Sequence, residues 1–70
     1  MNHQYYITFR PDANSYFFLV DINTPLESSS EVITCEHIIL IHDEEKATRK
    51  INDYIRKFPK YEFMLQEFRF

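Results

Sequence analysis

The residues of this chain best suited to chemistry are a cysteine and a histidine two positions apart, Cys35 and His37. On a β-strand they share one face, where a thiolate and an imidazole can form a nucleophile–base pair. Nucleophilic catalysis also needs a group that orients the imidazole and donors that stabilise an oxyanion, and the sequence shows neither around this pair. We therefore interpret Cys35 as a small core residue and His37 as a strand-edge residue, and we expect no catalytic residues and no enzyme activity.

A metal site is the second chemical possibility, because Cys35, His37, His42 and Asp43 lie close together in sequence and His3 is a further donor. On a regular strand His42 falls on the face opposite Cys35 and His37, so at most two ligands converge. A structural zinc site requires four ligands. We therefore expect no metal and no other cofactor, and the single cysteine excludes an internal disulfide.

The chain contains no glycine. The Walker phosphate loop, the dinucleotide-binding fingerprint, the KH clamp and the aromatic motif of RRM domains all need glycine where the backbone turns sharply or approaches a ligand. None of these motifs occurs in this sequence, so nucleotide or nucleic-acid binding through them is excluded.

Hydrophobic periodicity predicts the elements that must position these residues. Residues 4–10 alternate and residues 16–22 are apolar on both faces, which predicts a β-hairpin over residues 3–22. Residues 23–30 are expected to form a loop, and the β-branched residues of 31–42 predict a third strand. From Asp43 apolar residues recur at helical spacing until Pro59 ends the helix, and alternation over residues 61–69 predicts a fourth strand.

This β-β-β-α-β order predicts an α+β fold, with one amphipathic helix packed on one face of a four-stranded mixed sheet and residues 1–70 forming a single small domain. A right-handed crossover through the helix would make the third and fourth strands parallel. Two strand orders stay open: 1-2-3-4, and 3-2-1-4, which sets the first and last strands side by side. In either order the helix covers one face and leaves the other uncovered.

Twelve of the seventy residues are Phe or Tyr, and they gather toward the two ends of the chain. The residues expected in the helix-side core are Tyr5, Ile7, Phe9, Phe18, Ile51, Ile55, Phe58 and Phe63. The residues expected on the second sheet face are Tyr6, Phe17, Leu19, Met64 and Phe68. An exposed patch of aromatic side chains and methionine is typical of an interface. We therefore expect a small protein–protein interaction module, regulatory or inhibitory, that forms a homodimer through this face or an edge strand.

The net charge of -3 is unevenly distributed. Residues 1–45 hold eight acids against one base, which gives -7, and residues 46–70 hold seven bases against three acids, which gives +4. The basic residues along and just after the expected helix are Lys46, Arg49, Lys50, Arg56, Lys57 and Lys60. They offer an alternative function, nucleic-acid binding, in which this basic ridge contacts phosphates and exposed tyrosines stack on bases. Asp53 interrupts the ridge, so a solvated helix face is the preferred interpretation.

The first twenty residues show no basic region followed by an apolar core, and no apolar run in the chain is long enough to cross a bilayer. We therefore expect a cytoplasmic protein without a membrane partner. A protein of unknown identity, or a second copy of the chain, is the expected partner.

Overall fold

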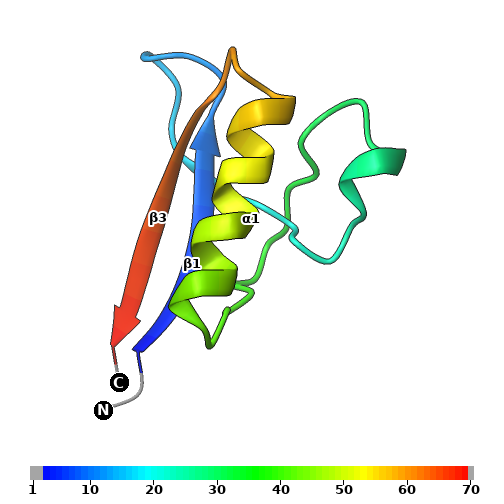
Figure 1. Ribbon diagram of the computed structural model, residues 1–70. Helices are drawn as coiled ribbons and strands as arrows, with labels where there is room; N and C mark the ends of the chain where they lie inside the picture. The colour runs from blue at the N-terminus through cyan, green and yellow to red at the C-terminus, as the bar shows by residue number, and fades with distance from the viewer. Residues whose placement is uncertain (1–2, 70) are drawn as a thin grey trace.

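A central strand, β1 (His3–Arg10), organises the fold in a computed structural model that describes residues 3–69 (Figure 1). The other elements are β2 (Phe18–Leu19), the 3-10 turn η1 (Leu26–Ser28), α1 (Glu44–Lys57) and β3 (Glu62–Arg69). The sheet order is β2-β1-β3 and both pairings are antiparallel. The expected α+β class is confirmed, with α1 packed across β1 and β3 on one face of the sheet (Figure 1).

The predicted hairpin is present, but its second strand is much shorter than residues 16–22. It comprises Phe18 and Leu19, followed by a single bridge from Val20 to Thr34. The turn before it is built on Asp12, whose carboxylate accepts from the Asn14 N–H at 2.8 Å. Such side-chain-capped turns need no glycine, and no residue of the described chain has a positive φ. Because Phe18 is 46 % exposed, the prediction of an interior strand is wrong here.

The prediction of a third strand over residues 31–42 is also wrong. Within this segment only Thr34 and Ile41 form isolated bridges, to Val20 and Tyr5 respectively. The physical reason is the lack of a long edge on which to pair. β2 offers two residues, and the segment must then turn to reach β1 beside Tyr5. β-branched residues favour an extended backbone, but an extended backbone becomes a strand only where a neighbour supplies a ladder.

The sheet is therefore three-stranded and antiparallel, not four-stranded and mixed. The parallel pairing expected across the helix does not form, because β3 pairs with β1 along its whole length, from His3 opposite Arg69 to Arg10 opposite Glu62. Of the two strand orders considered, the observed sheet shares with the second its placement of the first and last strands side by side.

Helix α1 begins and ends where the sequence predicts. Asp43 is its N-cap, and the Asp43 carboxylate accepts from the N–H groups of Glu45 and Lys46. The helix buries Ala47, Ile51 and Tyr54 against the sheet. The core residues shared by the helix and the sheet are Ile7, Phe9, Val20, Ile51, Tyr54 and Phe58.

Two residues expected in this core are exposed. Ile55 is 44 % exposed on the flank of α1, and Phe18 contacts Phe9 only through tilted rings at the rim of the sheet. The core is narrower than the apolar stripe in the sequence, because a helix over β1 and β3 buries only the residues that point directly at them.

Candidate interaction surface

The strand register places the second-face residues together. Residues directly opposite each other in an antiparallel pair share a face. Thr8 lies opposite both Met64 and Leu19, Gln4 opposite Phe68, and Tyr6 opposite Gln66. Since Ile7 and Phe9 point to the helix, these neighbours point to the other side of the sheet. Tyr6, Leu19, Met64 and Phe68 therefore lie on the second sheet face, as the alternation predicts.

Phe17 borders this face one residue before β2. The guanidinium of Arg10, which points to the same side as Thr8, stacks over the Phe17 ring with its central carbon 4.7 Å from the ring centroid. Arg10 is held in turn by the Glu62 carboxylate at 2.5 Å. Phe17 and Met64 are 36 % and 43 % exposed, whereas Tyr6, Leu19 and Phe68 are half-buried.

The centre of the second sheet face is polar, which the sequence did not indicate. Gln4 is buried, and its side-chain amide donates to Nδ1 of His42 at 2.8 Å. Gln4 Oε1 has no hydrogen-bond partner among residues 3–69. Thr8 is also buried, with its hydroxyl 3.5 Å from the Met64 carbonyl that accepts from it. The only available signal for Gln4 was its strand position, because contact with His42 depends on the path of the preceding loop.

Cys35 contacts the backbone of His37. The Cys35 thiol donates to the backbone carbonyl of His37 at 3.0 Å rather than to its ring. Burial raises the pKa of the Cys35 thiol, with a smaller opposing effect of this hydrogen bond and a further rise from the carboxylate of Asp21. A thiol with a raised pKa is mostly protonated at neutral pH and is a poor nucleophile.

The histidines and acids that suggested a metal site are spread over the molecule. His42 contacts Gln4 on the second sheet face, and His3 pairs with Glu67 at the end of β3. Asp43 is occupied as the cap of α1. No group of three or more His, Cys, Asp or Glu side chains among residues 3–69 is arranged to hold a metal ion.

The basic ridge is only partly available for phosphates. Arg49 pairs with Glu45 at 2.5 Å and Arg56 with Asp53 at 3.1 Å, each within one turn of the helix. Lys57 lies over the ring of Phe58, with its nitrogen 5.7 Å from the ring centroid. The two arginines, which bind phosphate best through both ends of the guanidinium, are thus engaged with acids of the same helix.

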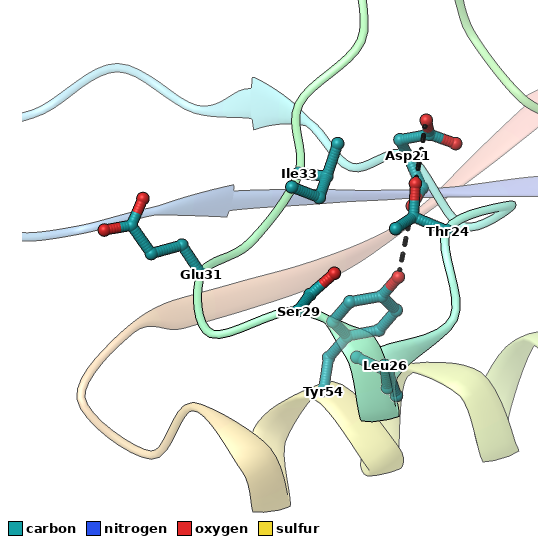
Figure 2. A pocket seen from close by; sticks show the side chains of 7 residues that line it. All are labelled: Asp21, Thr24, Leu26, Ser29, Glu31, Ile33 and Tyr54. Atoms are coloured by element: carbon teal, nitrogen blue, oxygen red, sulfur yellow. Dashed lines mark hydrogen bonds between the residues drawn. The ribbon is translucent and has the colours of Figure 1, made fainter.

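A hollow beside Tyr54 lies where α1 contacts the segment around Asp21, and it is too narrow for a ligand. Figure 2 shows the Tyr54 hydroxyl reaching the Asp21 segment, where it donates to the Asp21 backbone carbonyl at 3.3 Å. The Asp21 carboxylate accepts from the Thr24 hydroxyl at 3.3 Å, and Glu31 lies at the far end of the hollow (Figure 2). The hollow has no room for a water molecule. Burial, and secondly Asp21, raise the pKa of Tyr54, so its hydroxyl stays protonated as a donor.

A second hollow, of about 220 Å³, lies in the turn between α1 and β3. It is lined by Lys57, Phe58, Pro59, Lys60 and Tyr61. The rings of Phe58 and Tyr61 stack at 5.9 Å. Ligand pockets typically enclose about 300 to 1,000 Å³, so this open hollow is smaller than a typical ligand pocket.

Comparisons with known proteins do not identify the chain. No protein-family model, curated protein or solved structure matches it significantly. No helix in residues 3–69 has the length and apolar character to span a membrane. The function is therefore inferred from the molecule itself.

Proposed function

We propose that this protein is a small non-enzymatic interaction module that binds protein through the second sheet face, and that a second copy of the chain is its first partner. The observation that supports this most directly is the exposure of two large apolar side chains, Phe17 and Met64, on and beside that face. Helix α1 covers the opposite side of the sheet, and among residues 3–69 no helix or strand packs over Tyr6, Leu19 and Met64. Regulation or inhibition would follow when the module occupies a surface that its target needs.

The composition of this face supports the proposal. The second sheet face and its border carry exposed Phe17 and Met64 and half-buried Tyr6, and aromatic side chains and methionine are enriched in interfaces. Arg10, at the border of this face, is already oriented by an ion pair with Glu62. Its side chain would therefore lose little conformational freedom on binding.

A nucleic-acid-binding function has less support. Two of the six cations of the basic ridge, Arg49 and Arg56, are paired with acids, and the chain as a whole carries a charge of -3. Phosphate contacts are the main source of affinity for nucleic acids, so these pairs reduce the expected binding.

The experiment is a dilution series that compares the self-association of the wild type with two matched variants. Met64→Ser removes an exposed side chain from the second sheet face, and Ile38→Ser removes a similarly exposed one from the segment before α1, since the two residues are 43 % and 45 % exposed. We expect Met64→Ser to raise the dissociation constant at least roughly tenfold, which corresponds to about 1.4 kcal/mol. Ile38→Ser should leave it within about twofold of the wild-type value.

Sedimentation velocity over a wide concentration range gives these constants. Equal weakening by both variants would mean that any exposed apolar residue causes the association, and the specific face would then be refuted. A wild type that stays monomeric at every concentration would remove the second copy as a partner.

A further inference from the structure

Strand β3 leaves one long edge of the sheet open. It pairs with β1 along one side only, and among residues 3–69 no other strand pairs with its outer side. The opposite edge of the sheet is closed at β2. There the Asp21 N–H donates to the Ile33 carbonyl at 2.7 Å, and the Cys35 N–H donates to the Leu19 carbonyl at 3.1 Å. An open edge of eight residues is a template for another strand.

The hydrogen-bond pattern shows which residues of β3 direct their backbone groups outward. Tyr5 exchanges both backbone hydrogen bonds with Ile41, at 2.9 and 2.7 Å, on the side of β1 away from β3. Residues of an antiparallel strand alternate in direction, so Tyr6 directs its groups to β3 and bonds its opposite residue, Gln66. The odd-numbered residues of β3 therefore direct their backbone N–H and C=O groups toward the open edge. These residues are Phe63, Leu65, Glu67 and Arg69.

We propose that a second copy of this chain pairs antiparallel with the open edge of β3, about a two-fold axis normal to the sheet at Leu65, so that two three-stranded sheets become one continuous sheet. The proposal rests on self-association with a second copy, as proposed above, but places the contact at the β3 edge instead of over the second sheet face. Leu65 then lies opposite Leu65 of the second copy, and Phe63 opposite Glu67. These pairs exchange roughly six backbone hydrogen bonds, all from groups that already point outward.

Charge disfavours the registers shifted toward the C-terminal end of β3. An axis at Glu67 would set two Glu67 carboxylates directly opposite each other, and an axis at Gln66 would make them diagonal neighbours. Like charges opposite each other destabilise a strand pair. With the axis at Leu65, each Glu67 instead faces the ring of a Phe63.

The position of α1 fits this arrangement. Helix α1 packs against both β1 and β3, and we take its axis to lie midway between them, about half a strand spacing inside β3. With strands about 4.8 Å apart, the two helix axes would be separated by about two strand spacings, roughly 10 Å. Packed helices are typically about 8 to 10 Å apart, so the two helices would come into contact on the same face of the joined sheet.

The exposed flank of α1 supplies the side chain for that contact. Tyr54 leans toward the loop side of the helix, where its hydroxyl reaches Asp21. Ile55 is the next residue and lies about 100° further around the helix, which turns it away from the loops and toward the β3 edge. Its 44 % exposure, unexplained by the single chain, would be covered by the helix of the second copy.

The charges of the two helices also complement each other. Each helix carries Glu44 and Glu45 in its first turn and Arg56 and Lys57 in its last. A two-fold axis normal to the sheet makes the helices antiparallel, so the acidic end of one approaches the basic end of the other. A parallel arrangement would set like charges together.

The test compares Glu67→Pro with Glu67→Gln. Both variants remove the carboxylate, but only proline removes the outward N–H, and the pairing with β1 does not use that N–H. We expect Glu67→Pro to raise the dissociation constant at least about 100-fold, because each dimer loses two symmetry-related hydrogen bonds. Glu67→Gln should stay within a few-fold of the wild type. Circular dichroism and thermal melting of both variants check that the monomer remains folded.

Disulfide cross-linking in a Cys35→Ser background fixes the register. Leu65→Cys should form a cross-linked dimer, because directly opposite residues of a hydrogen-bonded pair lie about 5.5 Å apart between Cα atoms, within disulfide range. Gln66→Cys should not, since two copies of residue 66 would lie roughly 8 Å apart. The reverse result would overturn the axis at Leu65.

The outcomes separate this geometry from the proposed function. If Glu67→Pro associates as tightly as Glu67→Gln while Met64→Ser weakens association, the second sheet face is used but the edge pairing is wrong. If Glu67→Pro dissociates and Met64→Ser does not, the edge pairing holds and the second sheet face plays no part in self-association. A wild type that stays monomeric throughout the dilution series overturns the edge pairing and removes the second copy as a partner of the second sheet face.

Discussion

Replacing Ile7 by valine tests whether the helix-side core is the source of the stability of this fold. Ile7 lies in the middle of β1 and is 1 % exposed, in contact with the core of helix and sheet residues. The substitution removes one methylene group and keeps the β-branched shape, so strand propensity changes little. Measured Ile→Val costs in buried sites are about 0.5 to 1.5 kcal/mol, and we expect about 1 kcal/mol here.

This loss is large for a chain of seventy residues. At about 0.05 to 0.15 kcal/mol per residue, the whole free energy of unfolding is roughly 3.5 to 10 kcal/mol. In domains of this size 1 kcal/mol lowers Tm by about 4 to 8 °C. The matched control is Ile38→Val, at a residue that is 45 % exposed, which should change the free energy of unfolding by less than about 0.5 kcal/mol.

Thermal melting followed by circular dichroism measures both Tm shifts, and urea unfolding measures both free energies. All proteins are compared at one concentration, because self-association raises Tm by mass action. The slope of the urea transition should be the same for all three proteins, since none of the changes alters the surface exposed on unfolding. Equal effects of Ile7→Val and Ile38→Val, or no effect of Ile7→Val, would refute the assignment of Ile7 to the core.

Two further predictions concern ionisable groups. Because burial raises the pKa of the Cys35 thiol, alkylation of native protein should be slow at neutral pH and should accelerate only above the usual thiol pKa of about 8.5; rapid alkylation at pH 7 would contradict the non-catalytic interpretation. The pKa of Glu67 is lowered, chiefly by its hydrogen bond with His3 and also by Arg69. A carboxylate with a lowered folded-state pKa stabilises the protein above its unfolded pKa, and this stabilisation is lost as pH falls through the folded value. The stability difference between wild type and Glu67→Gln in urea should therefore be present near neutral pH and fade below about pH 4; a difference that is constant down to pH 2 would exclude this ion pair as its cause.

Local sequence patterns predicted the features that do not depend on distant parts of the chain. The helix boundaries followed from Asp43 and Pro59, because a capping carboxylate and a proline act on the backbone within one turn. The residues of the second sheet face followed from strand alternation, since burial of Ile7 and Phe9 fixes the direction of every other residue in β1.

Features that depend on tertiary neighbours could not be predicted in this way. Residues 31–42 are as rich in β-branched residues as a typical strand. To form a strand, however, they must pair with a free sheet edge of comparable length, and β2 provides only two residues. The contact between Gln4 and His42 requires the loop to bring Ile41 beside Tyr5, which no local pattern encodes. Ile55 belongs to the apolar stripe of α1, yet no strand lies beyond β3 within the described chain to cover it.

The division of charge along the chain has a structural counterpart in the ion pairs. The three acids of the basic part all form ion pairs with arginines: Asp53 with Arg56, Glu62 with Arg10 and Glu67 with Arg69. Arg10, the single base of the acidic part, is the partner of Glu62. The acids of the basic part and the base of the acidic part are thus neutralised by ion pairs within the fold. Many acids of residues 1–45 and many bases of residues 46–70 remain on the surface. The first turn of α1 is acidic and its last turn is basic, so the helix carries opposite charges at its two ends, which an antiparallel second copy would complement and a parallel one would not.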